Sequence, residues 1–132
     1  MSPLDLGRLD GPVLLFGGNY SNLQATDALI VEAAHRGIPP ARVICTGDVV
    51  AYCAEPEETT QAIRDWGCHV IAGNCEEQLA AVAADCACGF EPGTECDTLA
   101  KGWYASPTRA YRERAAPGWP PCRKRSRSPP ED

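Results

Sequence analysis

Three short apolar runs organise the first half of the chain, and each ends in glycine followed by a polar residue. The runs are Val13-Leu-Leu-Phe-Gly-Gly-Asn19, Val43-Ile-Cys-Thr-Gly-Asp48 and His69-Val-Ile-Ala-Gly-Asn74. They do not alternate with polar residues, which is typical of strands covered on both faces of a sheet, and hence of parallel strands. The pattern therefore predicts three buried parallel strands.

Segments with helical spacing of apolar residues follow each run. The first is predicted over residues 22–36 and ends at Gly37, because glycine accepts the left-handed conformation that closes a helix. The second is predicted over residues 57–66, with acidic residues near its positive amino terminus. A third is predicted over residues 76–85. The resulting β-α-β-α-β-α order predicts an α/β fold with a parallel sheet as its core.

The loops that follow the three strands are where a ligand site is expected. Residues 17–22, 47–50 and 73–76 occupy these loops. In open α/β sheets, ligands bind beyond the carboxyl ends of the strands, where such loops meet. Candidate chemistry is therefore sought in these three segments.

Composition places the chain among soluble globular proteins. Its 132 residues are 44% hydrophobic and 23% charged, and no apolar run approaches the ~20 residues that span a bilayer. The first ten residues lack the basic flank and apolar stretch of a secretion signal. A cytoplasmic protein without membrane association is expected, and disulfides are disfavoured in that compartment.

The sign of the net charge changes near residue 100. Residues 1–100 carry four basic and fifteen acidic side chains, a net of −11, whereas residues 101–132 carry eight basic and three acidic ones, a net of +5. No Leu, Ile, Val, Met or Phe follows Leu99. We expect a folded α/β domain over residues 11–100 and a disordered Pro/Arg-rich tail over residues 101–132. A shift of reading frame after about Tyr104 is an alternative origin of this tail.

The three loops together resemble a known family. Leu15-Phe-Gly-Gly-Asn-Tyr-Ser-Asn-Leu-Gln24, Thr46-Gly-Asp-Val-Val50 and Gly73-Asn-Cys-Glu76 are similar, in order and spacing, to the first half of calcineurin-like metallophosphoesterases. In that family the strands end in Gly-Asp-x-His, Gly-Asp and Gly-Asn-His-Glu or Gly-Asn-His-Asp. The resemblance covers about residues 12–85 and implies the first half of a two-sheet sandwich flanked by helices.

The resemblance implies a metal centre and a reaction. Asp48 takes the place of the carboxylate that bridges two metal ions, and Asn74 takes that of the amide ligand. Two divalent cations about 3.5–4 Å apart, of Mn, Fe, Zn or Mg, would activate a water for hydrolysis of a phosphoester substrate. Gly18 and Tyr20 replace an Asp and a His ligand, and Cys75 replaces the catalytic His. These substitutions predict weak or absent activity, with Cys75 as a candidate catalytic thiol.

Other interpretations remain open beside this one. Asp48 after a glycine is also typical of a turn residue, and Gly17-Gly18 before a helix is a weak phosphate-binding signal. The chain is alternatively a non-catalytic binding or regulatory module that presents the loop from Gly18 to Tyr20 to a partner.

The eight cysteines suggest a second kind of site. Cys86, Cys88 and Cys96, joined by Cys75 or Cys68, form a candidate structural Zn site, although their spacing is not that of a zinc finger. Cys45 and Cys68 lie in or beside predicted strands, where they are expected as small core residues.

Two further expectations concern partners. The basic run at residues 123–127 is expected to be a solvated tail and not a nucleic-acid site, because the rest of the chain is acidic. Half of a sandwich leaves one apolar face of its sheet uncovered, so self-association is expected.

Overall fold

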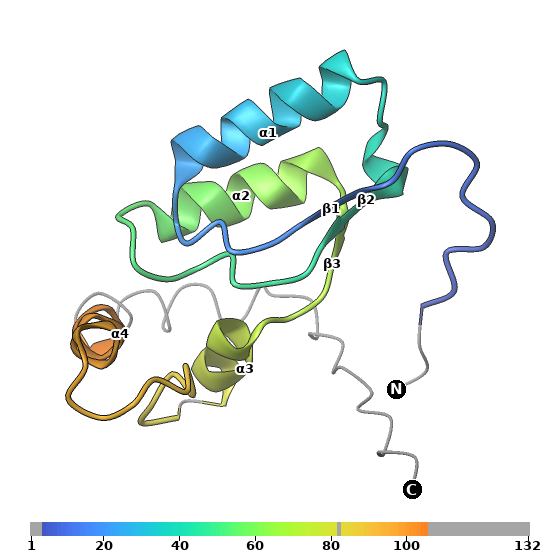
Figure 1. The fold of residues 1–132 in the computed structure, drawn as a ribbon. Helices are drawn as coiled ribbons and strands as arrows, with labels where there is room; N and C mark the ends of the chain where they lie inside the picture. Colours follow the sequence, from blue (N-terminus) through green and yellow to red (C-terminus); the bar gives the residue numbers. More distant parts are fainter. Residues whose placement is uncertain (1–3, 82, 106–132) are drawn as a thin grey trace, which may run out of the picture.

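The computed structural model describes residues 4–81 and 83–105 (Figure 1). The elements follow one another as β1 (Leu14–Phe16), α1 (Leu23–His35), a short 3₁₀ helix (Pro40–Arg42), β2 (Val43–Cys45), α2 (Pro56–Trp66), β3 (His69–Val70), α3 (Asn74–Ala80) and α4 (Glu95–Ala105). The predicted α/β class is confirmed.

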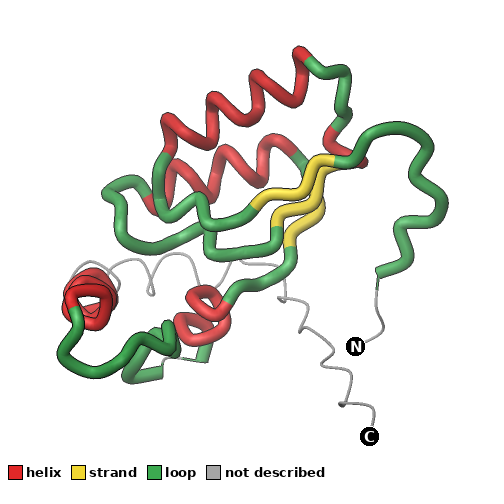
Figure 2. Tube along the Cα trace, in the orientation of Figure 1, coloured by secondary structure: helices red, strands yellow, loops and turns green. Residues whose placement is uncertain are grey.

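The sheet has three parallel strands in the order β1-β2-β3 (Figure 2). Phe16 pairs with Cys45, which in turn pairs with Val70. One position earlier, Leu15 pairs with Ile44 and Ile44 with His69. Because successive side chains of a strand point to opposite faces, these two rows belong to different faces of the sheet.

Helices α1 and α2 lie together on one side of the strands (Figure 1). Phe16 packs in this layer with Val43 and Cys45, which are fully buried, and with Trp66. Ile63 of α2 is 3% exposed in the same layer. Cys45 and Cys68 contribute to this core, as their positions in the sequence predicted.

The first two helices begin and end close to the predicted positions, for reasons visible in the sequence. The side chain of Asn22 caps α1 by accepting the backbone N–H of Ala25 at 2.9 Å. Helix α2 begins with Pro56, whose missing N–H costs nothing in the first turn. It ends at Gly67, which has φ 76°.

The third helix departs from its predicted bounds of 76–85. Helix α3 begins two residues earlier, at Asn74, because the Glu76 carboxylate accepts the N–H of Gly73 at 2.9 Å and closes the first turn there. It ends at Ala80. A chain reversal follows, in which Ala87 has φ 53°.

Helix α4 was not predicted, and it crosses the expected domain boundary at residue 100. Its amino terminus is capped by Thr94 Oγ1, which accepts the N–H of Asp97 at 3.2 Å. Ala100 and Tyr104 are buried in a cluster with residues of α3 and of the loop after β2. The structured part therefore reaches at least residue 105; the rest of the expected tail, residues 106–132, lies outside the described residues.

Among residues 4–81 and 83–105, none of the helices combines the length and the apolar character needed to cross a bilayer.

Candidate functional site

The loops after β1 and β2 are joined by backbone hydrogen bonds at the carboxyl ends of the strands. The N–H of Gly18 donates to the carbonyl of Gly47 at 3.0 Å. The N–H groups of Tyr20 and Ser21 donate to the carbonyls of Asp48 at 3.2 Å and of Val49 at 2.7 Å. The two loops therefore form one continuous edge. Together with the third loop they make up the surface that we call the rim (residues 17–22, 46–50 and 73–76).

Glu76 joins the third loop to the rim. Its carboxylate accepts four backbone N–H groups at 2.8–3.1 Å: those of Asp48, Val49, Val50 and Gly73. The residue is only 5% exposed. The four N–H groups occupy the acceptor sites of this buried carboxylate. Glu76 therefore holds the loops of the rim together and is not free to bind a ligand. The position of Glu76 in the sequence had not indicated this role.

Glycines make the close approach of the loops possible. A Cβ on Gly47, which has φ 101°, would collide with the backbone of Gly73. A Cβ on Gly73 would collide with the carboxylate of Asp48. The glycines of the strand-end motifs are thus required by packing between the second and third loops.

Asp48 lies against the third loop. It adopts a left-handed backbone conformation with φ 54°. Its Oδ1 accepts the N–H of Cys75 at 3.4 Å, which is a long contact. Asp48 is half-buried at the rim, and its carboxylate has acceptor capacity beyond this one contact. The predicted position of Asp48 beside the Gly73-Asn74 turn is therefore observed.

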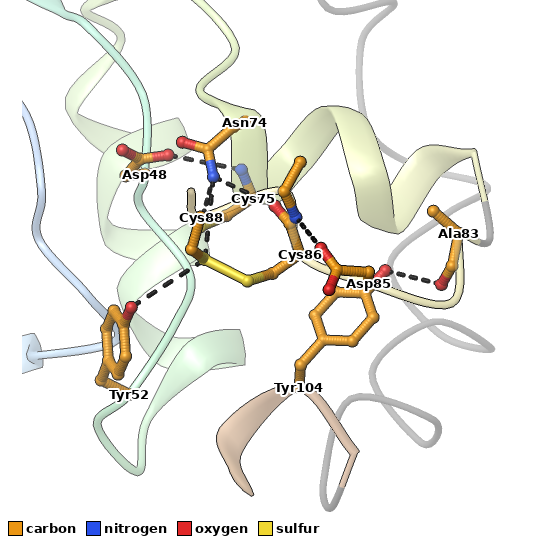
Figure 3. Close-up of a disulfide and its surroundings, with 10 residues drawn as sticks. Asp48, Tyr52, Asn74, Cys75, Ala83, Asp85, Cys86, Cys88 and Tyr104 are labelled. Atoms are coloured by element: carbon orange, nitrogen blue, oxygen red, sulfur yellow. Dashed lines mark hydrogen bonds between the residues drawn. A yellow bond between two sulfur atoms is a disulfide. The ribbon is translucent and has the colours of Figure 1, made fainter. Parts of the chain in front are cut away.

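Asn74 is held by the cysteine-bearing segment that follows α3. Its Nδ2 donates to the carbonyl of Cys86 at 3.1 Å and lies 3.9 Å from Cys88 Sγ. Figure 3 shows this nitrogen turned toward the cysteines and the side-chain oxygen turned toward Asp48. The structure thus brings both predicted ligand residues to the same part of the rim.

The substituted positions Gly18 and Tyr20 offer no equivalent ligands. Gly18 has φ 69°, and the ring of Tyr20 packs against it. The same ring meets that of Tyr52 edge to face, with centroids 5.2 Å apart. Partial burial, followed by the negative charge of Asp48, raises the pKa of Tyr20. The phenol therefore stays protonated at neutral pH, when it is a poor metal ligand.

Cys75 is in an environment that suppresses thiolate formation. The residue is 3% exposed. Burial first, and then the negative charges of Asp48 and Glu76, raise the pKa of its thiol. The thiolate is the reactive form of cysteine. These surroundings disfavour the catalytic role that the sequence suggested for Cys75.

The cysteines of the alternative Zn site are arranged differently from the prediction. Cys86 and Cys88 are joined by a disulfide, and Cys96 is an exposed free cysteine (Figure 3). The expectation that disulfides are disfavoured was wrong for this pair, which a tight turn brings together. While the disulfide is formed, its two sulfurs cannot act as thiolate ligands of zinc.

The residues present do not fit a two-metal centre. At the positions that match the family's metal ligands, the rim keeps one carboxylate, Asp48, and one amide, Asn74, next to a glycine and a protonated phenol. Both histidines are elsewhere: His35 ends α1, and His69 in β3 contacts the carbonyl of Ala41 at 3.2 Å. Within the part of the chain that the structure describes, no group of three or more His, Cys, Asp or Glu side chains is arranged to hold a metal ion.

Comparison with known proteins adds a similarity over a short stretch of the chain. No known family model matches the chain, and no solved structure matches it. The chain is similar to the uncharacterized protein MJ0912 of Methanocaldococcus jannaschii, with 40% identity over 55 residues. This stretch is 42% of the chain and only 22% of the relative. The chain thus spans a small part of that protein's length.

Proposed function

We propose that the chain is a metallophosphoesterase-like scaffold with an incomplete metal centre, and that it hydrolyses phosphoesters weakly or not at all. One observation carries the proposal: Asp48 and Asn74 lie on the same part of the rim, while the neighbouring ligand positions hold Gly18 and the protonated Tyr20. A single carboxylate with one amide supports at most weak binding of one hard cation.

Cation binding and turnover test the proposal directly. We expect the purified chain to bind no more than one equivalent of Mn²⁺ weakly by calorimetry, and to hydrolyse p-nitrophenyl phosphate at close to the buffer rate. Asp48→Asn should abolish the residual Mn²⁺ binding, because it removes the only charged acceptor available at the rim. Asp27→Asn, which changes an exposed carboxylate in α1, is the matched control.

A restored ligand set provides the sharper test. The double variant Gly18→Asp with Tyr20→His supplies the two residue types that the resemblance implies, and it removes the ring that lies against Gly18. Aspartate tolerates the left-handed conformation at position 18 better than most residues. We expect Mn²⁺ affinity to rise at least roughly ten-fold, about 1.4 kcal/mol. Unchanged affinity in a folded double variant would contradict the assignment of the rim.

A second candidate function is a binding module, favoured by the aromatic residues beside the rim. Tyr20 and Tyr52 are each 39% exposed and pack together, and Tyr52 continues to Trp103 at 5.4 Å. Exposed aromatic residues are enriched at protein interfaces. If this function holds, Tyr20→Ala should weaken capture of a partner while leaving Mn²⁺ binding unchanged.

A further inference from the structure

A small cavity lies beside the Cys86–Cys88 disulfide. Its volume is about 210 Å³, and its lining includes Asp85, Cys86, Cys88, Phe90, Lys101 and Tyr104. This volume is below the roughly 300–1,000 Å³ typical of pockets for drug-sized ligands. A molecule of the size of an amino acid is therefore the kind of ligand that this cavity can take.

The two sulfurs of the disulfide are in unequal surroundings. Cys86 is 6% exposed and belongs to the apolar cluster that contains Leu79 and Tyr104. Cys88 is only partly buried and packs against the outside of that cluster. A small molecule in the cavity therefore reaches the sulfur of Cys88 more easily than that of Cys86.

Two donors point at the more accessible sulfur. The hydroxyl of Tyr52 lies 4.0 Å and the Nδ2 of Asn74 lies 3.9 Å from Cys88 Sγ (Figure 3). These polar contacts hold Cys88 Sγ in place beside the cavity, and its accessibility makes it the exchanging sulfur.

We propose that Cys86 and Cys88 are a thiol–disulfide exchange pair that reacts with small thiols and disulfides of the size of cysteine bound in this cavity. Cys88 is the exchanging sulfur and Cys86 the resolving one. The proposal does not depend on the phosphoesterase-like assignment of the rim.

The reaction balances with a small disulfide, RSSR, as the oxidant. The Cys88 thiolate attacks one sulfur of RSSR, which forms Cys88–S–S–R and releases RS⁻. Cys86, after losing its proton to solvent, then attacks Cys88 Sγ, forms the internal disulfide and releases the second RS⁻. Both RS⁻ ions are protonated to RSH, so RSSR is reduced and the two protein thiols are oxidised. Excess RSH drives the same steps backwards.

The charge of the cavity selects among small thiols. Among the described residues that line the cavity, Lys101 is paired with Asp97 at 2.7 Å, and no basic side chain is paired with the carboxylate of Asp85. A net negative lining disfavours an anionic thiol. Cystine, a zwitterion overall, should therefore react faster than oxidised glutathione, which carries net negative charge.

Single-cysteine variants of the full chain test the unequal roles. Reduced protein is incubated with cystine at neutral pH, quenched with acid and mapped by mass spectrometry. In Cys86→Ser we expect a stable cysteine adduct on Cys88. In Cys88→Ser we expect the adduct on Cys86 to be at least roughly ten-fold slower to form, because that thiol is buried. The adduct on exposed Cys96 serves as the internal reference in every sample.

Two controls keep the result interpretable. Cys53→Ser removes an exposed free cysteine that does not line the cavity, and it should leave the Cys86–Cys88 bond and its rate of formation unchanged. Circular dichroism verifies that each variant is folded. Equal adduct rates on the two cysteines in folded variants, or no Cys86–Cys88 bond in the oxidised natural chain, would overturn the proposal. No metal or phosphoester is present, so either result leaves the rim assignment untouched.

Discussion

The two faces of the sheet are made of similar residues but have different surroundings. On the face beneath α1 and α2, Val43 and Cys45 are 0% exposed. On the opposite face, Leu15 pairs with Ile44 and Ile44 with His69, yet Leu15 is 64% exposed. We call these the covered face and the open face. Apolar composition alone thus does not show whether a position is buried.

The open face has the apolar composition that is typical of a packed sheet face. Strands that are apolar on both faces occur almost only where both faces are packed. The metallophosphoesterase-like scaffold that we propose would place a second sheet on this side. Among the described residues, Leu15 is the most exposed of the large apolar side chains. Stability should therefore come from the covered face, and association from the open one.

Glu76 tests whether stability comes only from apolar burial on the covered face, because this buried residue carries a charge. Glu76→Ala leaves four backbone N–H groups without their acceptor; those of Val49 and Val50 are buried, and each unsatisfied buried group costs about 1–3 kcal/mol. We expect the free energy of unfolding to fall by about 4 kcal/mol or more in urea denaturation. Glu77→Ala, an exposed neighbour in α3, should change it by less than about 1 kcal/mol. Similar effects of the two substitutions would refute the structural role of Glu76.

A matched pair of truncations sharpens the comparison of the two faces. Ile63→Ala on the covered side opens a cavity, and we expect a loss of about 3 kcal/mol in the free energy of unfolding. Leu15→Ala on the open face should cost less than about 1 kcal/mol, since its side chain already contacts water. Equal losses in thermal or urea unfolding would mean that the open face is covered in solution.

The pH dependence of the free energy of unfolding is a further test of burial on the covered face. Burial on the covered face raises the pKa of Cys45 from 9.0 to about 12. Below pH 9 the thiol is protonated in both states. Between pH 9 and about 12 it ionises only in the unfolded chain, so the free energy of unfolding should fall by up to about 1.4 kcal/mol per pH unit.

Cys45→Ala should reduce the fall of the free energy of unfolding with pH in this range. In a separate experiment, iodoacetamide at pH 8 should label exposed Cys53 long before Cys45. Rapid labelling of Cys45 under native conditions would show that the helices do not protect the covered face.

The smallest expected effect concerns association through the open face. Leu15→Lys places a charge where a second copy would pack, and we expect self-association measured by light scattering to weaken roughly ten-fold. Val31→Lys alters an apolar side chain of α1 that is 57% exposed, and it should leave association unchanged. Association that responds equally to both substitutions would not be specific to the open face.

Local signals predicted the three strands and the first two helices, located α3 with different bounds and missed α4. Asn22, Pro56 and Gly67 act through contacts within a few residues, so the bounds of α1 and α2 follow from short segments. Helix α3 begins at Asn74 because the carboxylate of Glu76 accepts the N–H of Gly73. The three-residue spacing of this pair is that of a capping box. Helix α4 was missed although Thr94 and Asp97 have capping spacing, because a change in composition near residue 100 suggested a boundary instead.

The candidate site was predicted in position but not in detail. Strand-end motifs placed Asp48 and Asn74 at one edge, and the structure brings them together there. The contacts of Asn74 with Cys86 and Cys88 and the four donors on Glu76 join residues far apart in the chain. Such contacts depend on how the loops fold over one another, which residue type and spacing do not specify.

By itself, the sequence determined a parallel α/β unit and the three loops at its carboxyl edge, because apolar runs, glycines and helix caps act over a few residues. Only the tertiary structure decided which face of the sheet is covered, that Glu76 is an internal acceptor, and that Cys86 and Cys88 form a bond beside a cavity. Burial and charge at a residue depend on neighbours from distant segments, and these neighbours are known only once the chain is folded.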